Sequence, residues 1–126
     1  MENNNIQKNC SKESNGFPCF IPAQRVLNLI SKKWSIQIIH LLGGEKIYRY
    51  NDLREKLQQG WKRDKISDAT LSARLSQLVK EGLILREVYP ELPPRVEYTL
   101  SKKGINLSKA LVPLIDWTVS VCHEKL

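Results

Sequence analysis

The sequence predicts a mainly α-helical fold that contains one small β-hairpin. Apolar residues recur at helical spacing in several segments, and two short runs rich in β-branched and aromatic residues flank a proline-rich turn at residues 90–94. The chain has 126 residues, the usual length of one domain. Because residues 1–20 are mostly polar, we expect a flexible N-terminal arm there and one folded domain over residues 21–126.

Two helices are expected at the start of this domain. Pro22 suits the first turn of a helix because its missing N–H would have no partner there, and apolar residues follow as far as Ile30. Ser31 is expected to cap a second helix, which carries Trp34 among its apolar residues. The pair Gly43-Gly44 should end this second helix.

Two further helices are expected in the middle of the chain. A brief strand at residues 46–50 precedes a third helix that begins at Asn51, and a polar, basic loop follows over residues 58–66. Ser67 is expected to cap a fourth helix that runs to about Glu81. The leucines of this fourth helix fall within one arc, so its opposite side should present small and hydrogen-bonding side chains to solvent.

The C-terminal part predicts a hairpin and a long helix. Strands are expected at residues 83–89 and 95–100, and the prolines between them cannot continue a strand ladder, so they should form a projecting turn. Ser101 is expected to cap a final helix with a broad apolar side, kinked at Pro113. The order of elements therefore places a helix-turn-helix directly before a two-stranded wing, an arrangement suited to reading duplex DNA.

The charge of the chain agrees with a polyanionic partner. The formal net charge is +7 and the isoelectric point is about 9.5, which favours nucleic acid first and an acidic membrane surface second, although many basic proteins bind neither. Basic residues gather around the fourth helix, where an ordinary solvated helix face is the alternative to groove binding. For Arg95 the alternative is a cross-strand pair with Glu87 or Glu97. The candidate DNA-binding residues are Tyr48, Arg49, Asn51, Lys62, Lys65, Ser67, Thr70, Ser72, Ala73, Arg74, Gln77, Lys80, Pro94 and Arg95.

The apolar side of the final helix is too wide for so small a body, so part of it should meet a second subunit. A two-fold dimer would place two recognition helices about one DNA turn apart and predicts an operator with inverted half-sites. The alternative is that these residues complete the core of a monomer. The candidate interface residues are Val26, Leu107, Leu111, Leu114, Trp117 and Val121.

Other classes of protein find little support in the sequence. His40 and His123 are the only histidines, and no nucleophile paired with a base, cofactor-binding motif or metal-ligand spacing is recognisable, so we expect no catalysis, no cofactor and no metal. We also expect no membrane span and no signal sequence, hence a cytoplasmic protein with reduced cysteines. A winged-helix module that binds protein or RNA is the remaining alternative.

Four segments, residues 22–34, 50–57, 71–83 and 86–100, resemble the HxlR family of bacterial and archaeal regulators. The last, followed by Gly104 and Trp117, is the most specific and looks like that family's wing and dimer helix. The resemblance implies a MarR-like winged-helix dimer that represses or activates transcription. It also implies DNA-binding roles for four residues: Arg74, Gln77, Pro94 and Arg95.

The chain departs from the family's usual pattern at two places. The family usually has Cys-Pro at the start of its first helix, where this chain has Ile21-Pro22, and Cys19 lies two residues earlier. Some relatives sense electrophiles or oxidants through that thiol, so Cys19 and Cys122 are candidates for redox sensing, with inert thiols as the alternative. Residues 58–65 form a longer loop than the family's short turn. The effector and the regulated genes are not identified by the sequence.

Overall fold

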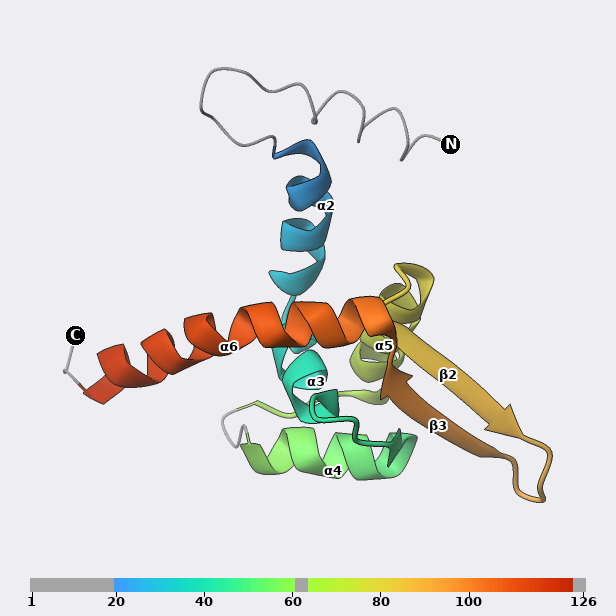
Figure 1. Ribbon diagram of the computed structural model, residues 1–126. Coiled ribbons are helices and arrows are strands. Elements are labelled where there is room, and N and C mark those ends of the chain that lie inside the picture. The colour runs from blue at the N-terminus through green and yellow to red at the C-terminus, as the bar shows by residue number, and fades with distance from the viewer. Residues whose placement is uncertain (1–19, 61–63, 124–126) are drawn as a thin grey trace. The chain divides into compact units, whose positions relative to one another are not determined.

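The computed structural model describes residues 20–60 and 64–123 (Figure 1). The chain divides into two units after Lys33, and each is described separately. The predicted N-terminal arm lies almost entirely outside the described residues. The first unit contains α2 (Ile21–Ile30), with Pro22 in its first turn as predicted.

The prediction that Ser31 caps the second helix is wrong, because Ser31 closes α2 instead. Its backbone N–H donates to the carbonyl oxygen of Leu27 at 3.0 Å, and its Oγ donates to that of Asn28 at 3.0 Å. The second unit begins at Trp34, which adopts a left-handed conformation (φ 80°) and is 2% exposed. Only after this residue does α3 (Ser35–Leu42) begin.

The next helix lies between a short strand and a basic loop. Gly43 ends α3 as predicted, and β1 (Tyr48–Arg49) leads directly into α4 (Tyr50–Gly60). The predicted end of α4 is wrong, since Gln58 is still helical. The Gln58 side chain donates to the carbonyl oxygen of Asp64 at 2.8 Å and accepts from the N–H of Ile66 at 3.1 Å, so it ties the helix end to the following loop.

The fourth predicted helix is confirmed as α5 (Asp68–Lys80). Ser67 caps it as expected, because its Oγ accepts a hydrogen bond from the N–H of Thr70 at 3.1 Å. Gly82 follows the helix with φ +76°, a conformation that glycine adopts without steric cost. Three leucines of α5 are buried: Leu71, Leu75 and Leu78.

The hairpin joins a third strand and becomes a small antiparallel sheet. Its strands are β2 (Ile84–Tyr89) and β3 (Arg95–Leu100), and β1 pairs on the other side of β3, which gives the order β1-β3-β2. The sequence predicted the brief strand β1 but not its pairing, in which Tyr48 stands opposite Tyr98. Figure 1 shows the β2–β3 hairpin projecting away from the helices of its unit.

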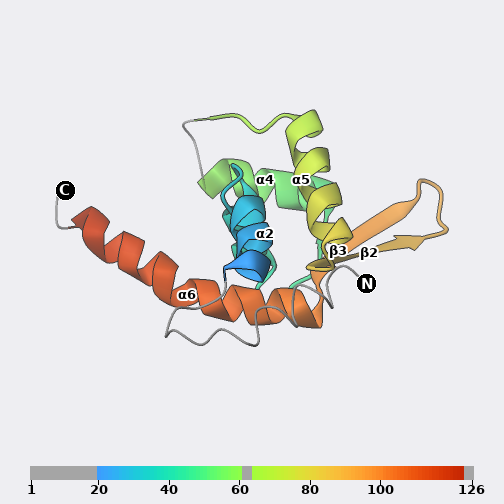
Figure 2. The same ribbon diagram turned by 90° about the horizontal axis from the view of Figure 1, so that it is seen from above.

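The last element is α6 (Lys102–His123), which runs continuously through Pro113. As predicted, Ser101 caps it, accepting from the N–H of Gly104 at 3.0 Å. The first turn of α6 packs closely on the connection between α5 and β2. A Cβ on Gly104 would overlap the carbonyl oxygen of Leu83 in that connection. Within the second unit, α6 contacts α3 and β3. Figure 2 shows that the axis of α6 bends along its length.

Candidate nucleic-acid interface

The side of α5 that lies opposite its buried leucines is exposed to solvent, as the sequence predicted. We call the residues Ser72, Ala73, Ser76 and Lys80 the polar side of α5; all four are exposed. They lie opposite the buried leucines because a helix turns 100° per residue. Small side chains next to serine hydroxyls leave room for this side to approach the edges of base pairs.

Thr70, Arg74 and Gln77 lie along one flank of α5, and all three are half-buried. The Arg74 guanidinium is 3.4 Å from the Gln77 side-chain oxygen, a long hydrogen bond between residues three positions apart. The two residues that the sequence singled out for base recognition are therefore adjacent. Both side chains carry hydrogen-bonding atoms, and both are partly buried against the rest of the protein.

A polar network that the sequence did not reveal joins α4 to the beginning of α5. The Tyr50 hydroxyl donates to the Asp68 carboxylate at 3.1 Å and lies 3.4 Å from the Ser72 Oγ. Arg54, one turn further along α4, forms an ion pair of 3.3 Å with the same carboxylate. Burial raises the pKa of Tyr50, and Asp68 raises it further, while the Ser72 hydrogen bond acts in the opposite direction. The network sets how the first turn of α5 lies against α4.

The remaining backbone-contact candidates surround this helix pair. Arg49 and Asn51 are exposed where β1 meets α4, and Lys65 is exposed shortly before α5. Tyr48 is half-buried in the sheet. Lys62 lies outside the described residues.

Arg95 in the hairpin is engaged by neighbouring groups. Its Nε lies 3.0 Å from a Glu91 carboxylate oxygen, close enough for an ion pair but without the alignment of a hydrogen bond, and 3.7 Å from Glu97. Its guanidinium lies 4.1 Å from the centre of the Tyr89 ring. Arg95 therefore lies near Glu97, but along the same strand and not across strands as the alternative had it. The residue opposite Arg95 is Tyr89, and Glu87 stands opposite Glu97. Pro94 is exposed beside it.

The second half of α6 carries a broad exposed apolar surface. Trp117 is 61% exposed, Val119 53% and Leu114 48%, while Val121 is half-buried. Leu111 needs correction as an interface candidate, because it is 5% exposed and already buried within the single chain. Leu107 on α6 and Val26 on α2 are half-buried.

The same helix bears on the expectation of no membrane span. By length and composition alone, Lys102–Cys122 is apolar enough to cross a membrane, contrary to our reading of the sequence. Such a feature in one helix is weak support for a span, and Lys109 and Asp116 place charges within it. The contacts of α6 with α3 and β3 fit a domain helix with a free apolar side.

The residues named for chemistry are scattered. Cys122 is an exposed free thiol near the end of α6, whereas Cys19 lies outside the described residues. His40 is exposed on α3. Within residues 20–60 and 64–123, no three histidine, cysteine, aspartate or glutamate side chains come close enough to hold a metal ion.

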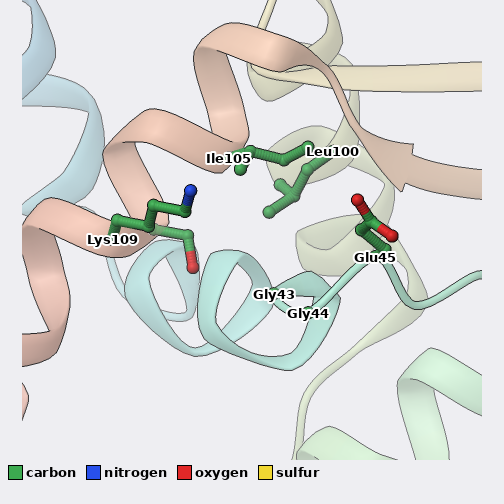
Figure 3. A pocket seen from close by; sticks show the side chains of 7 residues that line it. Gly43, Gly44, Glu45, Leu100, Ile105 and Lys109 are labelled. Carbon is green, nitrogen blue, oxygen red and sulfur yellow. The ribbon is translucent and has the colours of Figure 1, made fainter.

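A hollow of about 340 Å³ lies where the loop after α3 meets α6. Figure 3 shows Lys109 and Glu45 on opposite sides of it, with Leu100 and Ile105 between them. Gly43 forms part of its wall, and a Cβ there would come within 2.7 Å of the Ser108 Oγ. The close packing of α3 on α6 therefore depends on glycine at this position.

Comparison with known proteins agrees with this architecture. The chain is 34% identical over 106 residues to the putative regulatory protein MalR of Fusobacterium mortiferum, which covers 84% of this chain and 92% of that protein. A MarR-family putative transcriptional regulator from Porphyromonas gingivalis W83 superposes with a TM-score of 0.62 at 30% identity, over 91% of this chain and 99% of that one. The reduced form of the transcriptional regulator YodB from B. subtilis gives a TM-score of 0.65 at 26% identity, over 87% and 100%, and YodB has also been solved after diamide treatment.

The proteins that match this chain are regulators, and a family model also matches it. The HxlR-like helix-turn-helix family matches residues 29–126, which include α3 to α6 and the whole sheet. The helix α5, with its exposed polar side, corresponds to a helix of that family's helix-turn-helix. The hairpin beside it corresponds to the wing. The chain therefore belongs to the HxlR-like helix-turn-helix family and is a transcriptional regulator with a winged-helix DNA-binding domain.

Proposed function

We propose that this protein represses transcription by binding, as a homodimer, to an operator with inverted half-sites. The observation that carries the proposal is that the polar side of α5 is exposed beside a projecting hairpin. A helix with small and hydrogen-bonding side chains fits the major groove, while the hairpin reaches the adjoining backbone or minor groove. A protein with this activity works in the cytoplasm of a prokaryotic cell.

Base recognition is assigned to four residues spread along α5, from Thr70 to Gln77. Gln77 has the amide geometry that pairs with adenine, and Arg74 has the donors that pair with guanine. Thr70 and Ala73 lie on the neighbouring turns and supply a hydroxyl and an apolar contact. Backbone contacts are assigned to the residues around the helix pair and in the hairpin: Tyr48, Arg49, Asn51, Lys62, Lys65, Ser67, Ser72, Lys80, Pro94 and Arg95.

The homodimer is assigned to the exposed apolar surface of α6. Leu114 and Trp117 are each about half exposed or more and lie three residues apart on one side of α6, and an exposed apolar surface of this kind is stabilised by a second copy. Two-fold pairing places two copies of α5 about one DNA turn apart, roughly 34 Å. An inverted-repeat operator follows from this symmetry.

The experiment is selection of bound fragments from the source genome, followed by titration of the selected operator and a scrambled duplex. Arg74→Ala and Gln77→Ala should reduce the preference for the operator, whereas Lys65→Ala should weaken both duplexes alike. Lys102→Ala, an exposed lysine on α6, is the charge-matched control. Unchanged operator preference in both α5 variants would refute the assignment of α5. Absence of salt-dependent duplex binding would instead favour a protein partner, and a preference for RNA would favour an RNA-binding module.

A second candidate function is a thiol-based response to oxidants. It is favoured by the exposure of Cys122 and by the likeness to YodB, a regulator that has been studied with diamide. Diamide treatment should then create a disulfide between subunits, visible on a non-reducing gel, and change operator affinity. Cys122→Ser and Cys19→Ser identify the thiol involved. Unchanged affinity and no disulfide would eliminate this function while leaving the DNA-binding proposal intact.

A further inference from the structure

The two faces of the β2–β3 hairpin carry opposite charge. On one face Glu87 stands opposite Glu97, and Tyr89 stands opposite Arg95, whose guanidinium is already paired with carboxylates. The register places Arg86 opposite Tyr98 on the other face, in line with the buried pair Ile84 and Leu100. Because side chains alternate along a strand, Arg86 is separated from the carboxylates of the first face.

Arg86 borders a hollow between α5 and the sheet. The hollow has a volume of about 460 Å³. Three of its residues, Ser72, Ser76 and Lys80, follow one another at four-residue spacing along α5, so they line the same side. Among the described residues, Tyr50, Arg86 and Tyr98 supply the other polar side chains that line it.

The electrostatics of this hollow favour an anion. Lys80 and Arg86 are both exposed, and across residues 20–60 and 64–123 neither has a carboxylate partner within ion-pair distance. None of the described residues that line the hollow carries a carboxylate. The acidic group next to Tyr50, Asp68, is paired with Arg54. The hydroxyl groups of Ser72 and Ser76 add further donors. Two cations and two serine hydroxyls match the charge and the multiple acceptors of a phosphate group.

We propose that this hollow holds a phosphate of the DNA backbone, bound by Lys80 and Arg86, and that Arg86 rather than Arg95 makes the principal charged contact of the hairpin. The inference rests on the proposed function, because it requires α5 to lie in the major groove. The backbone that separates that groove from the adjoining minor groove then passes between α5 and the hairpin. Ser72 and Ser76 donate to the same phosphate from the polar side of α5.

The test compares Arg86→Gln, Lys80→Gln and Arg95→Gln, with Lys102→Gln as the control for loss of one positive charge. Fluorescence anisotropy measures the binding of each variant to the operator and to a scrambled duplex over a range of salt concentrations. Arg86→Gln and Lys80→Gln should each weaken both duplexes several-fold and reduce the slope of log affinity against log salt by about one. Arg95→Gln should weaken both duplexes less than Arg86→Gln does, because carboxylates already engage Arg95. Circular dichroism confirms that each variant is folded.

A neutral methylphosphonate placed at single positions of the operator identifies the phosphate itself. At one position in each half-site the substitution should weaken the wild-type protein but not Arg86→Gln, because the contact is already absent. The proposal is overturned if no position shows this dependence, or if the salt slope changes in Arg95→Gln and not in Arg86→Gln. Competition by inorganic phosphate at constant ionic strength, lost in Arg86→Gln without any change in DNA affinity, would assign the hollow to a free anion and also overturn it. A wild-type protein that binds no duplex would overturn the proposed function instead.

Discussion

The Tyr50 hydroxyl donates a hydrogen bond to the Asp68 carboxylate across 3.1 Å and thereby joins the beginning of α4 to the first turn of α5. The two residues are 18 positions apart in the chain. Ser72, on the polar side of α5, is within 3.4 Å of the same hydroxyl. Tyr50, which joins α5 to α4, therefore lies next to the side of α5 that we assign to DNA.

Replacing Tyr50 with phenylalanine removes this hydrogen bond and leaves the ring in place. We expect a loss of about 0.5 to 1 kcal/mol in the free energy of unfolding, since the bond is partly exposed to water. Urea denaturation measures it. Arg54→Gln, which removes the exposed ion pair with Asp68, should cost less. A loss in Arg54→Gln larger than in Tyr50→Phe would contradict this ranking.

The same hydroxyl predicts a difference in stability at high pH. Burial and Asp68 raise the pKa of Tyr50 above its ordinary value of 10.0, so the folded state holds this proton more tightly than the unfolded state. Its contribution is present below pH 10 and is lost as the pH rises through the higher pKa of the folded protein. Unfolding measured from pH 8 to 11 should show a steeper fall in wild type than in Tyr50→Phe. Parallel curves would contradict the assigned shift.

Replacement of the cap residue tests how α5 begins. Ser67→Ala removes the acceptor of the Thr70 N–H and should destabilise the protein by about 1 kcal/mol. Ser67→Asp retains an acceptor and should preserve most of the stability. Thermal unfolding followed by circular dichroism compares the two. Equal stability of the alanine and aspartate variants would show that the cap contributes little.

Three glycines should differ in their tolerance of alanine. Gly104→Ala should be the most damaging, by roughly 3 kcal/mol or more, because its Cβ would overlap the carbonyl oxygen of Leu83, which is backbone. Gly43→Ala meets the Ser108 Oγ at 2.7 Å and should cost about 1 to 3 kcal/mol. Gly82→Ala has open space but a positive φ and should cost about 1 kcal/mol.

A double variant tests whether the stability lost in Gly43→Ala comes from the steric contact with Ser108 and not from backbone conformation. Removal of the Ser108 hydroxyl should recover part of the stability lost in Gly43→Ala and none of that lost in Gly82→Ala. Urea denaturation of the single and double variants gives the interaction free energy. No recovery in Gly43→Ala with Ser108→Ala would show that the clash lies elsewhere.

The exposed apolar surface of α6 predicts a change in oligomeric state. Trp117→Glu places a charge at the centre of the proposed subunit interface and should shift a dimer toward monomer, as measured by analytical ultracentrifugation. Leu92→Glu is the matched control, because Leu92 is 100% exposed at the other end of the molecule's second unit, in the hairpin turn. A dimer that withstands Trp117→Glu but not Leu92→Glu would move the interface away from α6.

Sequence reasoning succeeded where the cause of an element is local. The cap at Ser67 and the spacing of the leucines predict α5, and the prolines at residues 90–94 predict the hairpin turn. It failed at Ser31, because α3 begins after Trp34, whose left-handed backbone is unusual for a large residue and accompanies its burial.

The missed parts of the candidate site depend on residues that are distant in the chain. The Tyr50–Asp68 hydrogen bond requires α4 and α5 to meet, and no periodicity encodes that distance. The charge difference between the hairpin faces depends on register, which sets Arg86 opposite Tyr98 and leaves Arg95 among carboxylates. From the sequence, only Arg95 of these two is a DNA-binding candidate, whereas their surroundings in the structure favour Arg86.

The joint between α6 and the end of α5 has a mechanical consequence. The Ser101 N–H donates to the Leu83 carbonyl oxygen at 3.0 Å, the Lys103 ammonium donates to that of Glu81 at 3.2 Å, and Gly104 leaves no gap beside Leu83. The C-terminal helix is therefore fastened directly to the connection between α5 and the hairpin. A change in the direction of α6 at this joint would displace the end of α5 and the beginning of β2 together.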